Sequence, residues 1–331
     1  MQKIRLDIYL AKNSRERSRS EIKRLIDAGD ILVNGEPRRP SFLLKGGERI
    51  EFRRRTPPRL RGEPPKSGPE PIPLDIIYED RQILVLNKQA GLVVHPAAGN
   101  YSGTLVNALL WHSQTGLTAD FHPGLVHRLD KGTSGVMVIA KTEASQRDLM
   151  LQFKRREVEK TYLALVFGRM ARKEDVISVP IGRDTHQRRK FSSRSRKTRE
   201  ATTFYRVKEE YSGLTLLEVF PKTGRTHQIR VHLSEAGHPI VGDTHYGAKS
   251  CLSSVDENIR DRLAGLTRPF LHAFRLSFIH PAEKMKVRFE APLSTDLEEL
   301  LEGIRGVHAA GSGVGIRDRI LGLGSLSPSE R

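Results

Sequence analysis

The stretch 55–73 is the feature that most constrains how this chain can fold. It runs from Arg55-Thr56-Pro57-Pro58 through Pro64-Pro65 to Pro71-Ile72-Pro73 and is rich in proline, arginine and glycine. Such a segment cannot bury a core, and its prolines stiffen it into an extended spacer. We therefore predict separate domains before and after it, with residues 55–73 as the linker.

The charge of the chain indicates a polyanionic partner. Lys and Arg total 56 against 39 Asp and Glu, which gives a formal net charge of +17 over 331 residues. A field of this sign favours nucleic acid or an anionic membrane surface. A membrane span needs about 18 consecutive apolar residues, and no apolar run in the sequence approaches this length.

Two further observations concern the compartment. The N-terminus, Met1-Gln2-Lys3-Ile4-Arg5, lacks the apolar core of a signal peptide. Cys251 is the only cysteine, so the sequence offers no internal disulfide and no cysteine-rich zinc site. We expect a soluble cytoplasmic protein without a membrane partner.

Residues 1–54 are predicted to form a small α/β module. Its predicted features are a helix opening at Ser20-Glu21 with Ile22, Leu25 and Ile26 on one face, a helix-ending Gly29, strands at Ile31–Val33 and Arg49–Phe52, and a hairpin turn at Asn34-Gly35. Its basic side chains are Arg15, Arg17, Arg19, Lys23 and Arg24. From the residues alone, this basic face is either merely solvated or binds RNA.

The pattern "RLD…L…SRSEIKRLIDAGDILVNG…LLKGGERIEF" covers almost the whole module. It resembles the small RNA-binding module first known from ribosomal protein S-four. The resemblance implies that the five basic residues bind RNA.

Residues 74–305 are predicted to form an α+β domain around a largely antiparallel mixed β-sheet. Strands are expected at Ile83–Leu86, Val136–Ala140, Tyr162–Val166, Ala201–Val207, Thr215–Phe220, Phe270–Phe278 and Lys286–Phe289, and helices at Thr104–Trp111, Glu143–Phe153 and Asp296–Ile304. Residues 306–331 have little apolar periodicity and are expected to form a mobile tail. The chain carries no phosphate loop and no dinucleotide fingerprint.

His127-Arg128-Leu129-Asp130 is the strongest candidate for chemistry. It places a carboxylate beside a cation at a turn, directly before Thr133-Ser134-Gly135 and a buried strand. Such a carboxylate can act as a nucleophile or as a base, and a nearby guanidinium favours its ionised form. The residues alone also fit a structural Asp130 that caps the turn. Gly135 would permit the tight turn into the strand, and the two hydroxyls would bind turn amides.

The longer pattern H-R-L-D-x-x-T-S-G-x-x-x-x-A-K resembles the catalytic motif of the RluA-type RNA pseudouridine synthases. These enzymes detach uracil from its ribose, rotate it and reattach it through carbon. The resemblance implies that Asp130 is the catalytic carboxylate and that no metal or organic cofactor is used. It also implies that Arg128 enters the RNA stack in place of the flipped nucleotide, whereas the residues alone would also fit a phosphate contact.

Two more segments resemble motifs of this family. In Lys160–Val166 the resemblance assigns Tyr162 to the active site. Of its two implied roles, stacking on the base is better supported than proton transfer, because a phenol is a poor base near neutral pH. In Thr223–Leu233 it implies an arginine that pairs with the catalytic aspartate. We expect Arg225, at the start of a helix capped by Thr226, with Arg230 as the alternative.

The same segment holds His227 and His232, with His238 close behind. Their spacing differs from that of a zinc-binding helix, so we predict no metal site.

Further RNA contacts are expected at two places. The basic stretch from Arg183 to Arg199, which includes Arg189 and Lys190, is predicted to be an exposed loop over the RNA backbone, or else one that only aids solubility. The segment from Lys88 to Pro96 matches an early family motif, and Lys88 is expected to line the cleft. Arg230 is also counted among the RNA contacts.

The resemblance extends from the N-terminal module to about Leu293 and is strongest to members that act on large-subunit ribosomal RNA. It implies a monomeric isomerase for uridines in 23S ribosomal RNA or an assembly intermediate. Another structured RNA such as tRNA, and a non-catalytic ribosome-associated RNA-binding protein, are the alternatives. An N-glycosidase would need a second carboxylate, and none is obvious beside Asp130.

Overall fold

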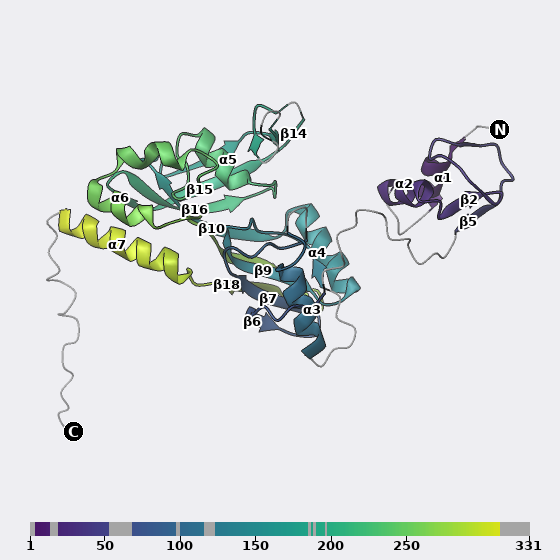
Figure 1. Cartoon of the computed structure of the whole chain (residues 1–331), viewed down its shortest axis with the longest axis horizontal. Coiled ribbons are helices and arrows are strands. Elements are labelled where there is room, and N and C mark those ends of the chain that lie inside the picture. The colour runs from purple at the N-terminus through teal and green to yellow at the C-terminus, as the bar shows by residue number, and fades with distance from the viewer. Residues whose placement is uncertain are drawn as a thin grey trace, which may run out of the picture. The chain divides into compact units, whose positions relative to one another are not determined.

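The computed structural model describes residues 4–13, 19–52, 68–96, 100–115, 123–184, 187, 190–195 and 197–311. The chain divides into two compact units, Met1–Glu63 and Pro64–Arg331 (Figure 1). Most of the predicted linker, up to residue 67, lies outside the described residues. Residues 68–73 belong to the second unit, because Ile72 packs on its core and Glu70 Oε2 accepts the N–H of Gly103 at 2.9 Å.

The first unit has the predicted α/β composition. Its elements are β1 (Ile4–Arg5), α1 (Leu6–Asn13), α2 (Arg19–Asp27), β2 (Ile31–Val33), β3 (Glu36–Pro37), β4 (Leu43–Leu44) and β5 (Ile50–Phe52). Ile22 and Ile26 of α2 are buried together with Leu6, Leu10 and Ile31. The predicted helix and both predicted strands are therefore confirmed.

The turn at Asn34-Gly35 shows how the sequence sets this local structure. Asn34 has φ 54° and Gly35 has φ 79°, and the turn joins β2 to β3 in antiparallel register. Two consecutive left-handed residues define the turn type that matches strand twist, and Asn-Gly adopts it at low cost. The Asn34 side chain also accepts the N–H of Arg49 at 2.8 Å, which fixes the next strand.

The second unit is built on one large sheet. Within the described residues it has ten strands: β6 (Asp75–Glu79), β7 (Ile83–Lys88), β8 (Gly124–Leu125), β9 (Ser134–Ala140), β10 (Glu159–Phe167), β11 (Glu174–Ser178), β15 (Thr202–Tyr211), β16 (Leu214–Pro221), β17 (Leu271–Ile279) and β18 (Lys286–Glu290). The main order is β11-β15-β16-β10-β17-β9-β7-β6. Of the described pairings in this sheet, only that of β9 with β17 is parallel. The predicted α+β class with a largely antiparallel sheet is confirmed.

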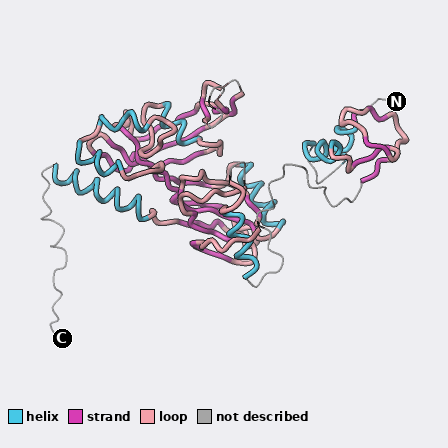
Figure 2. Tube along the Cα trace, viewed as in Figure 1, coloured by secondary structure: helices cyan, strands magenta, loops and turns pink. Residues whose placement is uncertain are grey.

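Helices lie at the periphery of this sheet (Figure 2). They are α3 (Leu105–Thr115), α4 (Glu143–Arg155), α5 (Gln228–Glu235), the 3₁₀ helix η1 (Ala248–Ser254), α6 (Glu257–Ala264) and α7 (Thr295–Gly311). Helix α4 contacts β9, whereas α5 contacts β15 and β16. None of the described helices is long and apolar enough to span a lipid bilayer.

The turn that carries Asp130 leads into β9, which pairs with β17 in parallel. Gly135 pairs with Ala273 at φ 115°, and a Cβ atom on Gly135 would lie 2.3 Å from the Ala273 carbonyl oxygen. Gly135 therefore permits close backbone approach as well as the turn. The prediction for Ser134 was wrong, because its hydroxyl contacts His272 Nδ1 at 2.9 Å instead of a turn amide.

The basic stretch 183–199 also differs from its prediction as a loop. Its described residues contribute to a small sheet of β12 (Ile181–Arg183), β13 (Phe191–Ser192) and β14 (Thr198–Arg199). The sheet forms because Ile181 is buried with Val231 and Tyr246, and Phe191 packs on that cluster. Packing of Phe191 on residues outside the stretch thus outweighs the charge of the stretch.

The boundary predicted for the C-terminal tail, at residue 306, is too early. Helix α7 continues past Gly306 to Gly311, because Val307 packs on the core after Leu301 and Ile304. Residues 312–331 lie outside the described residues.

Candidate active site

Asp130 lies in the turn that leads into β9. The Thr133 N–H bonds to the Asp130 carbonyl oxygen at 3.1 Å, which closes the turn. Leu129 is buried, whereas Arg128 is exposed and the Asp130 side chain keeps 19% of its exposure. The apolar residue thus anchors the turn and leaves both charged neighbours available to a ligand.

The Asp130 carboxylate faces a cavity of about 500 Å³. The cavity is lined from the Asp130 turn, the end of α4, β10, the segment 221–227, the start of α5 and Leu271 of β17. It therefore lies over the middle of the sheet, where β10, β17 and β9 are neighbours. Arg128, Asp130, Tyr162, Arg225, His227 and Arg230 all line it.

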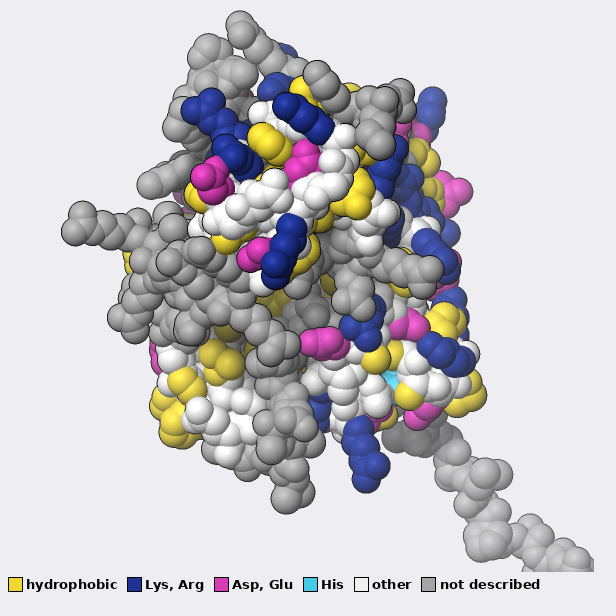
Figure 3. All heavy atoms as spheres, turned by 90° about the vertical axis from the view of Figure 1, so that its right-hand side faces the viewer, with side chains coloured by type: hydrophobic (Ala, Val, Ile, Leu, Met, Phe, Trp, Pro, Cys, Tyr) yellow, Lys and Arg dark blue, Asp and Glu magenta, His cyan; other side chains and the backbone are white. Residues whose placement is uncertain are grey.

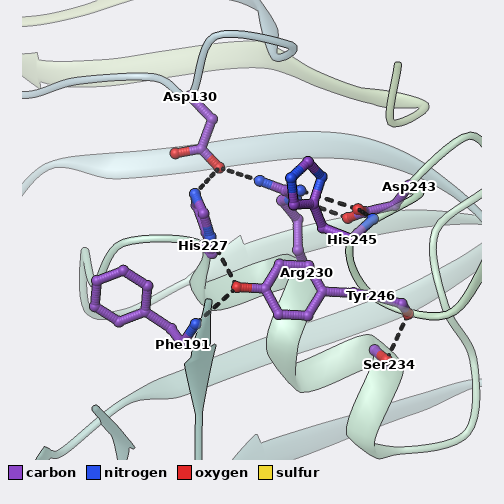
Figure 4. A network of polar contacts seen from close by, with 8 residues as sticks. All are labelled: Asp130, Phe191, His227, Arg230, Ser234, Asp243, His245 and Tyr246. Carbon is purple, nitrogen blue, oxygen red and sulfur yellow. Dashed lines mark hydrogen bonds and ion pairs between the residues drawn. The ribbon is translucent and has the colours of Figure 1, made fainter. Parts of the chain in front are cut away.

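Arg230 is the cation that pairs with Asp130. Its Nη1 lies 3.2 Å from Asp130 Oδ2, while Nε and Nη2 bind both oxygens of the fully buried Asp243 at 2.7 and 2.9 Å (Figure 4). Burial disfavours the charged guanidinium, but Asp243 and then Asp130 raise the pKa of Arg230 well above its ordinary value. A permanent cation beside Asp130 stabilises the ionised carboxylate.

The expectation that Arg225 is this partner was wrong, and the alternative was right. Arg225 Nε donates to the Glu200 carbonyl oxygen at 3.0 Å, although the residue does line the cavity. Helix α5 begins at Gln228, with His227 at the capping position instead of Thr226. Arg225 therefore precedes the helix, whereas Arg230 lies in its buried first turn. A downstream acid such as Asp243 is the sequence signal that could have favoured Arg230.

Tyr162 lies on β10 beside the cavity and packs against two hydrophobic clusters of the second unit. Burial, and then the negative charge of Asp130, raise the pKa of Tyr162 well above its ordinary value. The phenol thus stays protonated, which fits a stacking role better than that of a base.

Lys88 does not line the cavity, so its expected RNA contact was wrong. It is 1% exposed, and its Nζ donates to the carbonyl oxygens of Gln89 and Leu92 at 2.8 and 3.0 Å. Burial lowers the pKa of Lys88 to about 7, against the opposing charge of Asp130. Lys88 is buried because it is the last residue of β7, a strand in which nearly all residues are buried.

The predicted RNA contacts of the first unit are only partly described. Arg15 and Arg17 lie outside the described residues, as does the side chain of Arg24. Lys23 is exposed. Arg19 Nη2 lies 2.8 Å from Oδ2 of Asp7, while most of the Arg19 side chain remains exposed.

In the basic stretch, Arg189 lies outside the described residues, and Lys190 is half-buried. A second basic group at the cavity was not predicted from the sequence. Lys154 and Arg156 at the end of α4, Lys160 on β10, and Lys222 line the cavity. Burial, and then the charge of Lys222, lower the pKa of Lys160 to about 8. The run Lys154-Arg155-Arg156 was the available signal. Lys and Arg side chains are also spread over the face in Figure 3.

His227, His232 and His238 have different partners. His232 contacts Thr203 Oγ1 and the Val179 carbonyl oxygen, and His238 contacts the Phe167 carbonyl oxygen. His227 faces the cavity. In the part of the chain that the structure describes, no group of three His, Cys, Asp or Glu could hold a metal ion.

Family models match both units of the chain. The RNA pseudouridylate synthase family model matches residues 82–235, and the S4 domain model matches residues 4–50. The ribosomal large subunit pseudouridine synthase D of Neisseria meningitidis serogroup A is 43% identical over 91% of this chain and 79% of that protein. Its counterpart from Xanthomonas campestris is 41% identical over 91% and 89%.

Two more relatives extend the comparison. An uncharacterized RNA pseudouridine synthase of Aquifex aeolicus is 44% identical over 86% of this chain and 89% of that protein. The structure of the human RNA pseudouridylate synthase domain containing 4 is similar with a TM-score of 0.58 at 27% identity, covering 70% of this chain and 93% of that one. The fold and the match define an isomerase that acts on RNA. This chain belongs to the RNA pseudouridylate synthase family and carries an N-terminal S4 domain.

Proposed function

We propose that this chain isomerises uridines of large-subunit 23S ribosomal RNA to pseudouridine, with Asp130 as the catalytic carboxylate. The observation that carries the proposal is the hydrogen bonding of this carboxylate. Arg230 binds Oδ2, whereas Oδ1 has no hydrogen bond to any described residue and stays available in the cavity. The target RNA is inferred from relatives named as large-subunit pseudouridine synthases.

The chemistry fits a site with one carboxylate. The ribose C1′ moves from N1 to C5 of uracil, C5 loses a proton and N1 gains one, so the net reaction needs no oxidant or reductant. Attack on the sugar, attack on the base and elimination through a glycal all start from an ionised oxygen at the nucleotide. Tyr162 supplies an aromatic face for the detached base, and Arg128 is suited to fill the space that a flipped nucleotide leaves.

The RNA itself is expected to bind through the basic lining of the cavity and through the S4 domain. Lys154, Arg156, Lys160 and Lys222 offer phosphate contacts near the nucleotide. Arg19 and Lys23 offer them in the first unit. A monomer in the cytoplasm, with no cofactor, remains our prediction.

Tritium release tests the proposal. Large-subunit ribosomal RNA is transcribed with uridine tritiated at carbon five, and isomerisation releases this label. Asp130→Asn should abolish release, while RNA affinity in a filter-binding assay stays nearly intact. Abasic sites would indicate an N-glycosidase, and binding without release by the wild type would indicate a binding protein. Label released from tRNA alone would move the target to tRNA. Turnover by Asp130→Asn would show that Asp130 is not the catalytic carboxylate.

A further inference from the structure

His227 adopts an unusual backbone conformation directly at the cavity. It has φ 58° and ψ 17° and stands at the capping position of α5, yet its side chain makes no capping hydrogen bond. Left-handed conformations are uncommon for residues other than glycine and concentrate at functional sites. The conformation turns the imidazole toward Asp130, and His227 Nε2 lies 3.8 Å from Asp130 Oδ2 (Figure 4).

Tyr246 holds the other side of this ring. Its hydroxyl lies 2.8 Å from His227 Nδ1 and accepts the backbone N–H of Phe191 at 2.9 Å. The rings of Phe191 and Tyr246 both contact the imidazole edge-to-face, at centroid distances of 5.5 and 5.7 Å. Two aromatic side chains and one hydrogen bond therefore fix the orientation of His227.

The network favours one tautomer of the neutral imidazole. The Phe191 N–H can only donate, so the Tyr246 hydroxyl is free to donate its own hydrogen to Nδ1. The proton of neutral His227 then lies on Nε2 and faces the carboxylate. The other tautomer would place a lone pair against Asp130. The charged and titratable groups that face His227 are Asp130, Arg230, Asp243, His245 and Tyr246. Burial lowers the pKa of His227, which keeps the ring neutral near neutral pH.

Tyr246 supports Arg230 as well. The Arg230 guanidinium lies over the Tyr246 ring, with Cζ 5.0 Å from the centroid. One tyrosine thus contacts both groups that hold Asp130, and both of them approach Oδ2. Arg230 binds Oδ2 and the imidazole lies 3.8 Å from the same oxygen, so Oδ1 is the oxygen left for the nucleotide.

We propose that His227 is a positioning residue for Asp130 and that Tyr246 fixes its tautomer. This inference rests on the proposed function, since it concerns how Asp130 is aimed during isomerisation. The imidazole is fixed with Nε2 3.8 Å from Oδ2, so by packing and by its dipole it restricts the rotation of the carboxylate that one contact from Arg230 would permit.

The test compares single-turnover tritium release with enzyme in excess over the labelled ribosomal RNA. His227→Ala should lower the rate about 10- to 100-fold, the range found when a group that orients a functional side chain is removed. RNA affinity should stay within about twofold, because His227 contributes no net charge to phosphate binding. His227→Gln should recover part of the rate, because an amide N–H can reach toward Asp130 and both variants bear the same backbone cost.

Two readouts separate positioning from mere structure. Tyr246→Phe keeps the ring under Arg230 and removes the hydroxyl, which contacts both His227 Nδ1 and the Phe191 N–H. The rate should fall about 3- to 10-fold, as expected for loss of the hydrogen bond that orients His227. The second readout is the partial recovery of the rate in His227→Gln, because a general loss of structure would lower the rates of His227→Ala and His227→Gln equally. His238→Gln is the matched control, since this histidine contacts the Phe167 carbonyl oxygen away from the cavity, and its rate should equal that of the wild type.

The outcomes distinguish this inference from the proposed function. Turnover by Asp130→Asn in the same assay overturns the proposed function. An inactive Asp130→Asn together with wild-type rates in His227→Ala and Tyr246→Phe overturns only the role of His227. Equal losses in His227→Ala and His227→Gln also overturn it. If His227→Ala does not fold, Tyr246→Phe decides alone, and a wild-type rate there overturns the proposal.

Discussion

Asp7 in the first unit and Asp130 in the second both pair with arginine, but with opposite burial. The Asp7 side chain is 3% exposed, while its partners Arg5 and Arg19 are 43% and 58% exposed. At the cavity the arginine is the buried partner, with Arg230 at 8% and Asp130 at 19%. In the first unit a buried acid holds cations at the surface, whereas in the second a buried cation holds an acid in a cavity.

The difference shows what each ion pair can do. A cation presented to solvent binds phosphate without reading sequence, which suits an RNA-binding module. An acid presented to a cavity and backed by a buried cation suits covalent chemistry. The same residue types thus suit binding in one unit and, under the proposed function, catalysis in the other, depending on which member is buried.

The largest effect should come from Arg230→Met. It leaves Asp243 buried without its cation, and breaking a buried pair costs about 3–5 kcal/mol of unfolding free energy. Urea denaturation would measure this loss for the second unit, and tritium release should fall as well. Arg225→Met is the matched control, with a cost of about 1 kcal/mol or less, because Arg225 only donates to a carbonyl oxygen. Similar costs for the two variants would contradict the assignment of Arg230 as the partner.

Removal of residues 1–54 should weaken RNA binding but spare the chemistry. We expect an affinity loss of about tenfold or more at 0.1 M salt and a shallower dependence of log Kd on log salt, because several phosphate contacts are lost. The single-turnover rate at saturating enzyme should stay within about threefold. Salt slopes that are equal with and without the module would show that its cations do not contact RNA.

Features that depend on local sequence were predictable, whereas features that depend on contacts between distant residues were not. Element types were predictable, because apolar periodicity and Asn34-Gly35 act locally. The general place of the site was also predictable, since Asp130 follows a motif before a buried strand. The choice between Arg225 and Arg230 was not, because it depends on where α5 begins and on Asp243, which is distant in sequence. The burial of Lys88 and the small sheet around Phe191 likewise depend on tertiary packing.

Asp7 should make the stability of the first unit sensitive to acid. Burial opposes its charge, but hydrogen bonds from Arg5 and Arg19 lower the pKa of Asp7 below its ordinary value. A carboxyl group whose pKa is lower in the folded state contributes stability above its unfolded pKa, and this contribution is lost as pH falls through the folded pKa. Asp7→Asn should therefore reduce stability at pH 7 and flatten its loss below about pH 4.

Thermal melting of the isolated module as a function of pH would measure this effect. Asp27→Asn is the control, because Asp27 ends α2 as an exposed residue. A curve for Asp7→Asn that stays parallel to the wild type would show that the ion pair contributes nothing to the acid response.

The smallest effect concerns one cation at the cavity. Lys222 is exposed and lines the cavity, so Lys222→Gln should remove one phosphate contact and reduce the salt slope by about 1, with little change in single-turnover rate. Lys208→Gln is the control, because Lys208 is an exposed lysine near Glu218 and does not line the cavity. An unchanged slope for Lys222→Gln would restrict phosphate binding to the first unit. A reduced slope in both variants would indicate a diffuse basic field in place of a contact at Lys222. Either result would sharpen the contrast between cations that bind RNA and the cation that supports Asp130.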